Sequence, residues 1–163
     1  MNSKSKIITD LSKLKSLIAM YQRQGKVIAF TNGCFDILHL GHINYLETAK
    51  KVNRILIVGL NSNTSVRKIK GKHRPIVPQR ERARILAALS CVDFVVIFNE
   101  ETPYNLIKAL RPDVLIKGAD WKDKHVVGRE IVESYGGKVE LIQYIPGSST
   151  TRLIETIIKK CKK

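Results

Sequence analysis

Short apolar runs rich in β-branched residues alternate along this chain with stretches of helical periodicity. The first helical stretch, residues 10–24, spaces leucine, isoleucine and tyrosine along one face, and Gly25 can end it. Strand-like runs then recur at intervals, and they read KVIAFT, RILIVGLN, DFVVIF, DVLIKG and KVELIQY. Helical patterns separate or follow these runs, at about 42–52, 79–90, 103–110, 126–135 and 151–161.

Nearly continuous apolar strands alternating with helices are typical of a parallel sheet covered on both faces. We therefore predict an α/β fold, a doubly wound, Rossmann-like sheet of about five parallel strands preceded by the N-terminal helix. No repeat or linker divides the chain, so residues 1–163 are expected to form one domain with a basic tail at 159–163. Ligands of such sheets bind at the carboxyl ends of the strands, which places three polar stretches on one rim: 31–42, 61–74 and 118–121.

The charge balance sets this chain apart from an ordinary soluble domain. Lysine and arginine number 29 against 14 acidic residues, so the formal net charge is +15. This excess suggests an anionic partner, which could be nucleic acid, an anionic membrane surface or a phosphorylated small molecule. Solvated basic ends explain part of the charge, but the interior segment 66–84 concentrates Lys and Arg opposed only by Glu81.

Cysteine usage and hydropathy restrict further the class of protein to which this chain can belong. Cys34, Cys91 and Cys161 form neither a zinc-binding spacing nor an even disulfide framework. The chain shows no signal peptide and no apolar run of membrane-spanning length, so we expect a cytoplasmic protein that does not insert into a membrane. No metal site built from protein side chains is predicted.

The stretch TNGCFDILHLGH, residues 31–42, carries the most distinctive chemistry. It follows an apolar strand and places His39 and His42 three positions apart, on one face of a helix that begins there. Unpaired N–H groups and the helix dipole favour an anion at that first turn, and imidazoles can donate to phosphate oxygens. Gly33 can let the backbone approach a ligand closely, and Gly41 removes a side chain where a phosphate would have to pass.

TNGCFDILHLGH resembles the H-x-G-H signature of the nucleotidyltransferase superfamily. Four later segments resemble, in order, the bacterial heptose-1-phosphate adenylyltransferases: LNSNTSVRKIKGKHRPIVPQRERARIL, SCVDFVVIF, LRPDVLIKGADW and IPGSSTTRLIETI. The likeness covers residues 26–158. It implies a nucleotidyltransferase fold and transfer of AMP from ATP to a heptose 1-phosphate, giving ADP-heptose and pyrophosphate for lipopolysaccharide-core or related glycan precursors. Some members also carry a sugar-kinase domain; at this length we expect any kinase step to lie elsewhere.

Such a reaction needs no protein nucleophile, because the sugar phosphate attacks the α-phosphorus in line; the protein positions the substrates and neutralises charge. The predicted catalytic residues are His39, His42 and Lys70, and Mg²⁺ is expected as a cofactor bound mainly through the ATP phosphates. The resemblance, together with position after strands, predicts these nucleotide-binding residues: Thr31, Asn32, Gly33, Phe35, Gly41, Asn61, Lys68, Arg82, Ser149, Thr150 and Thr151. The last three can cap a helix as well as hold phosphates.

The acceptor-binding residues are predicted to be Asp36, Arg74, Gly118, Asp120 and Trp121. Asp36 has a second interpretation, in which its carboxylate turns inward and caps a loop, and we favour that role over a Mg²⁺ contact. Related cytidylyltransferases have an Arg shortly before the GSST segment. The sequence QYIPGSST has none, so no guanidinium contact is expected on that side.

Two alternatives stay open. The first is a cytidylyltransferase acting on glycerol 3-phosphate or a similar alcohol phosphate, since the residues alone do not separate ATP from CTP. The second is a basic nucleic-acid-binding module, supported by the charge and by the likeness of H-x-G-H to a motif of class I aminoacyl-tRNA synthetases. RNP, KH and zinc-finger patterns are missing, so we expect no specific nucleic acid as a partner. The expected partners are ATP and a heptose 1-phosphate. We also expect a homo-oligomer, most simply a dimer.

Overall fold

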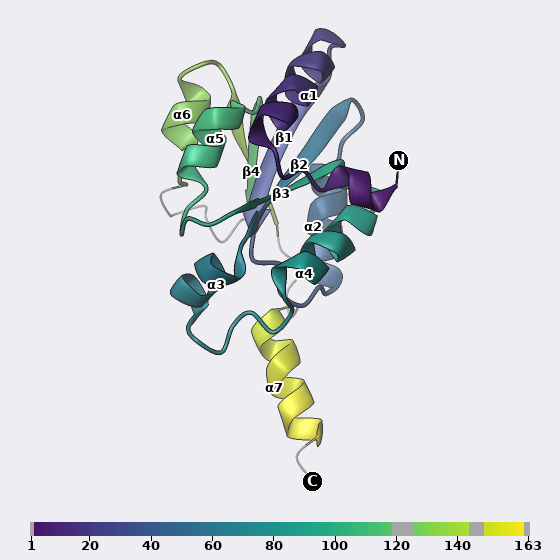
Figure 1. Ribbon diagram of the computed structural model, residues 1–163, viewed down its shortest axis with the longest axis vertical. Coiled ribbons are helices and arrows are strands. Elements are labelled where there is room, and N and C mark those ends of the chain that lie inside the picture. The colour runs from purple at the N-terminus through teal and green to yellow at the C-terminus, as the bar shows by residue number, and fades with distance from the viewer. Residues whose placement is uncertain (1, 119–125, 144–148, 162–163) are drawn as a thin grey trace.

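The computed structural model describes residues 2–118, 126–143 and 149–161, which form an α/β domain around one sheet (Figure 1). The strands are β1 (Val27–Gly33), β2 (Arg54–Asn61), β3 (Phe94–Phe98), β4 (Val114–Gly118) and β5 (Lys138–Ile142). A short 3₁₀ helix, η1 (Ser3–Lys6), precedes the α-helices. These are α1 (Leu11–Arg23), α2 (Leu40–Ala49), α3 (Asn63–Lys70), α4 (Gln79–Ala88), α5 (Tyr104–Leu110), α6 (Arg129–Glu133) and α7 (Thr150–Cys161).

The five strands are parallel, in the order β3-β2-β1-β4-β5. The chain moves outward from β1 to β3 and then returns to the other side of β1 with β4. The carboxyl ends of β1 and β4 therefore flank the topological switch point, where open α/β sheets bind ligands. The predicted doubly wound, five-stranded parallel sheet is confirmed.

Two apolar layers cover the two faces of the sheet, because successive strand side chains point to opposite faces. Along β1, Ile28 and Phe30 pack with α1, α5 and α6, whereas Ala29 packs with α2 and α4. The predicted N-terminal helix is confirmed as α1. It begins after Asp10, whose Oδ1 accepts a hydrogen bond from the Ser12 N–H at 2.8 Å.

Helix α3 was not predicted, since the sequence pattern left residues 61–74 as a polar rim stretch. The helix buries only Ser65 and Val66 and has just two apolar residues, Val66 and Ile69, so too few apolar positions mark it in the sequence. Its start depends on a local cap, in which the Ser62 hydroxyl accepts from the Ser65 N–H. The first basic residues of this region, Arg67, Lys68 and Lys70, therefore lie on a helix and not in a loop.

The last helix, α7, projects from the body of the domain (Figure 1), and none of its residues is buried. Its N-terminus lies against the segment after β1, where the Thr150 hydroxyl donates to the Ile37 carbonyl at 3.2 Å. Within the described ranges, no helix is long and apolar enough to cross a membrane.

Candidate active site

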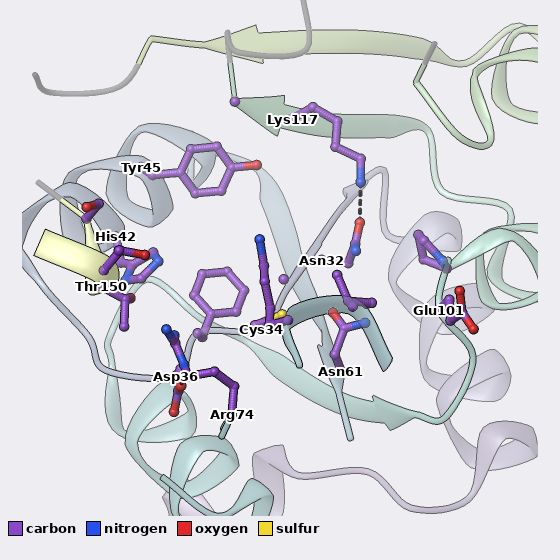
Figure 2. A pocket seen from close by; sticks show the side chains of 18 of the residues that line it. Asn32, Cys34, Asp36, His42, Tyr45, Asn61, Arg74, Glu101, Lys117 and Thr150 are labelled. Atoms are coloured by element: carbon purple, nitrogen blue, oxygen red, sulfur yellow. Dashed lines mark hydrogen bonds and ion pairs between the residues drawn. The ribbon is translucent and has the colours of Figure 1, made fainter. Parts of the chain in front are cut away.

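A cavity of about 610 Å³ opens at the carboxyl ends of the strands, across the switch point (Figure 2). Its wall combines the segment after β1, the ends of β2 and β4, the loop after β3, and the N-terminus of α7. These segments are far apart in the sequence and meet because parallel strands end at the same edge of a sheet. We therefore expect the predicted nucleotide to bind in this cavity.

The two histidines form a stacked pair at the start of α2. His39 is the N-cap residue, and the His42 N–H donates to its carbonyl at 2.9 Å. Their ring centroids lie 3.8 Å apart at an interplanar angle of 24°, and the Phe35 ring lies 5.2 Å from His42. The Nδ1 atoms of both rings are buried and have no hydrogen-bond partner among the described residues. The described protein atoms thus leave one nitrogen of each ring without a hydrogen bond.

The environment keeps this pair neutral at pH 7. Burial, and then the neighbouring His39, lower the pKa of His42 to about 4, and burial also lowers the pKa of His39. A phosphate placed against these rings supplies both an acceptor and a compensating negative charge. Phosphate binding is therefore expected to raise both pKa values and to strengthen hydrogen bonds from the rings.

The free energy of unfolding is expected to fall as the pH drops from 6.5 to about 4, because the folded chain keeps His42 neutral while the unfolded chain protonates it. The loss should reach roughly 3 kcal/mol. Urea unfolding at pH 7.5 and at pH 4.5 measures it, with His42→Gln as a variant that cannot titrate. Equal losses in the wild type and in the variant would contradict a depressed His42 pKa.

Asp36 turns away from solvent and organises the chain after α3. Its carboxylate accepts from the Arg74 Nε at 2.5 Å and from the N–H groups of Ile76 and Val77 at 3.0 and 2.8 Å. Burial would raise the pKa of Asp36, but the two N–H groups and the Arg74 guanidinium outweigh it and lower the pKa. Both oxygens are engaged by the protein, which favours the inward role over the predicted acceptor contact.

The N-terminus of α7 brings hydroxyl groups to the cavity wall. The Ser149 hydroxyl accepts from the Arg152 N–H at 3.1 Å, so it caps the helix, and Thr150 and Thr151 also line the cavity. A helix N-terminus presents unpaired N–H groups and a partial positive charge. This end of the cavity is thus suited to phosphate groups.

The family follows from comparison with known proteins. A family model described as cytidylyltransferase-like matches residues 30–160. The chain belongs to this family of nucleotidyltransferases. It is 54% identical over 152 residues to the bifunctional protein HldE of Geobacter sulfurreducens, a match that covers 93% of this chain and 31% of that protein. The bifunctional protein HldE of Magnetococcus marinus is 47% identical over 150 residues, again with 31% of its length covered. This chain therefore spans about a third of the curated relatives it matches.

Two solved structures of other proteins are similar to this fold. The lipopolysaccharide core biosynthesis protein of Thermoplasma volcanium superposes with a TM-score of 0.58 at 27% identity, covering 73% of this chain and 96% of that one. Pantoate-β-alanine ligase of Francisella tularensis, solved with β,γ ATP and β-alanine, gives a TM-score of 0.62 at 18% identity, covering 84% and 66%. The second likeness shows the fold alone.

Most of the residues predicted for nucleotidyl transfer do come together. Those of the segment from β1 to α2 that line the cavity are Asn32, Gly33, Phe35, Asp36, His39 and His42. Those that line it from other elements are Asn61, Lys70, Arg74, Gly118, Ser149, Thr150 and Thr151. Asp120 and Trp121 lie outside the described residues. The roles of the lining residues in the reaction stay predictions.

Four predicted nucleotide-binding residues do not line the cavity. Thr31 is buried and its hydroxyl lies 2.7 Å from the Tyr45 hydroxyl, and Gly41 is buried within α2. Lys68 is exposed on α3, where two positions correspond to a rotation of about 200°, so it points away from the side that carries Lys70. Arg82 is the fourth, and hydrogen bonds to backbone carbonyls hold its side chain away from the cavity.

Arg82 lies behind the cavity wall and joins three segments of backbone. It is 1% exposed. Its guanidinium donates to the carbonyls of Cys34, Asn61 and Val77 at 2.5, 2.9 and 2.9 Å, and to Asn63 Oδ1 at 3.0 Å. The predicted direct contact with nucleotide is therefore replaced by a positioning role, in which one buried cation holds the ends of β1 and β2 against the loop before α4.

Sequence reasoning missed several residues of the wall, above all Lys117 and Glu101. Lys117 is only 6% exposed, at the end of β4, and its ammonium donates to Asn32 Oδ1 across the switch point (Figure 2). A lysine within an otherwise apolar strand, next to Gly118, was the available signal. Glu101 follows β3 and lines the cavity. Nothing in its local sequence distinguishes it from Glu100.

Proposed function

We propose that this chain transfers AMP from ATP to a heptose 1-phosphate, giving ADP-heptose and pyrophosphate. The observation that carries the proposal is the stacked, neutral histidine pair facing a cavity with the N-terminus of α7, Lys70 and Lys117 in its wall. Such an arrangement suits a nucleoside triphosphate. The segments that resemble heptose-1-phosphate adenylyltransferases, and the likeness to a lipopolysaccharide core biosynthesis protein, support the sugar acceptor.

In this proposal the acceptor phosphate attacks the α-phosphorus in line, and pyrophosphate leaves on the opposite side. The rings of His39 and His42 donate to the equatorial oxygens, where negative charge develops. Lys70 and the hydroxyls of α7 hold the leaving phosphates. Asp36 and Arg82 act indirectly, because they position the loop that carries Arg74.

We also propose Mg²⁺ as the cofactor, held by the triphosphate rather than by a protein cage. In the part of the chain that the structure describes, no group of three or more His, Cys, Asp and Glu side chains converges. Asp36 already accepts hydrogen bonds from the protein. Mg²⁺ keeps several waters and commonly binds through substrate phosphates, where it neutralises charge on the leaving group.

The test is a matrix of purified protein, Mg²⁺, ATP or CTP, and acceptors including heptose 1-phosphate and glycerol 3-phosphate, with pyrophosphate release as the measurement. We expect the highest kcat/KM for ATP with heptose 1-phosphate, and a product mass equal to that of ADP-heptose. The cytidylyltransferase-like family match favours one second candidate, which would show as a preference for CTP with glycerol 3-phosphate. Absence of pyrophosphate release with every pair would overturn both.

Removal of the basic tail, residues 159–163, is expected to leave kcat/KM within about threefold of the wild-type value. Residues 159–161 are the last of α7, a helix with no buried residues, and charges exposed to solvent are screened at physiological salt. Steady-state pyrophosphate release at 150 mM salt checks this. A loss of tenfold or more would place the tail in the reaction.

A further inference from the structure

The end of the cavity formed by the loop after β3 differs in charge from the end near the histidines. Glu101, Thr102 and Pro103 line it, and Figure 2 shows Glu101 across the cavity from His42 and Thr150. Among the described residues, Glu101 makes no ion pair within 4 Å. Asp36, the other carboxylate in the wall, is occupied by Arg74 and backbone N–H groups. Glu101 therefore contributes a carboxylate without a cationic partner among the described residues to this end of the cavity wall.

A carboxylate repels a phosphate and accepts strong hydrogen bonds from hydroxyl groups. The phosphates of the nucleotide are accordingly expected near Lys70 and α7, away from Glu101. Lys117 and Asn32 lie between these two ends in Figure 2. A ligand that has an anionic group near Lys117 and hydroxyls near Glu101 matches this order of charges.

The loop that carries Glu101 is held in place by the protein. Asn61 Nδ2 donates to the Ser65 hydroxyl at 2.8 Å, and that hydroxyl donates to the Glu100 carbonyl at 2.6 Å. The Ser62 N–H donates to the Phe98 carbonyl at 2.9 Å. These bonds connect the loop to the end of β2 and to α3, and supporting contacts of this kind lower the entropic cost of binding.

The in-line geometry of the proposed reaction indicates which of the two substrates lies near Glu101. If α7 holds the departing pyrophosphate, the attacking oxygen must approach from the opposite side of the α-phosphorus. We propose that Glu101 accepts hydrogen bonds from hydroxyls of the acceptor sugar remote from its phosphate, and so selects the heptose. This inference rests on the function proposed above and names a specificity residue for it.

Steady-state kinetics of Glu101→Gln test the proposal, with heptose 1-phosphate varied at saturating ATP. The amide keeps the shape of the side chain and loses its charge. We expect the KM for heptose 1-phosphate to rise about 10- to 100-fold, and the KM for ATP to stay within about twofold. Mannose 1-phosphate, which lacks the seventh carbon and its hydroxyl, should bind the wild type more weakly, and the variant should lose most of this preference for heptose.

Glu100→Gln is the matched control, because Glu100 is the adjacent carboxylate and does not line the cavity. It should behave as the wild type in every assay. An unchanged KM for heptose 1-phosphate in Glu101→Gln, a rise in the KM for ATP instead, or equal effects of both variants would overturn the inference while leaving the proposed function standing. A wild-type protein that releases no pyrophosphate with heptose 1-phosphate would overturn the proposed function itself, and the inference with it.

Discussion

His42→Ala is expected to lower kcat for pyrophosphate release by about 10²- to 10³-fold while changing the KM for ATP much less. The ring stands at the first turn of α2, stacked on His39, with a buried nitrogen that has no partner in the described residues. A donor held in this way interacts most strongly with the charge that develops in the transition state. Its removal therefore costs more in the chemical step than in binding.

His39→Ala should show a similar loss, because the two rings act on the same phosphate. His73→Ala is the matched control, since His73 is an exposed histidine between α3 and α4 and does not itself line the cavity. It should keep kcat within about twofold of the wild type. A His42→Ala protein that retains the wild-type kcat would remove His42 from the proposed mechanism.

Arg82→Met is expected to reduce the free energy of unfolding by about 3–5 kcal/mol, as when one partner of a buried polar network is removed. The variant leaves the carbonyls of Cys34, Asn61 and Val77 without the guanidinium that satisfies them. Urea unfolding measures the loss. Activity should fall as well, since the segments that Arg82 joins form one wall of the cavity.

Arg80→Met is the control for this change, because Arg80 lies on the same helix and is exposed. It should change the free energy of unfolding by less than about 0.5 kcal/mol. Arg82→Lys should not restore stability, because an ammonium group lacks the planar fork that reaches several acceptors. Equal stabilities of Arg82→Met and Arg80→Met would contradict the positioning role.

The sheet was predictable because its signal is local. Runs such as RILIVGLN are apolar at nearly every position, as a strand covered on both faces must be, and β2 is buried along its whole length. Helix α3 was missed for the opposite reason. Its start depends on the Ser62 hydroxyl, and it is eight residues long and buries only one apolar side chain, Val66, so the apolar pattern there is too short to identify a helix.

Positions on the rim of the sheet followed from the sequence, since residues just after parallel strands must lie at one edge. His39, His42 and Asn61 were placed in this way, and the structure brings them into one cavity. The sequence by itself thus determined the architecture, the edge where ligands bind, and the histidine pair at the start of a helix.

Only the tertiary structure decided which charged side chains face that cavity. Arg82 and Lys70 look alike in a basic segment, yet the first is buried among carbonyls from three segments and the second lines the wall. Glu100 and Glu101 are neighbours, and only Glu101 lines the cavity. The direction in which a side chain points depends on its position around a helix, on hydrogen bonds within loops and on contacts with residues distant in the chain. None of these can be read from the identity of a single residue or of its neighbours.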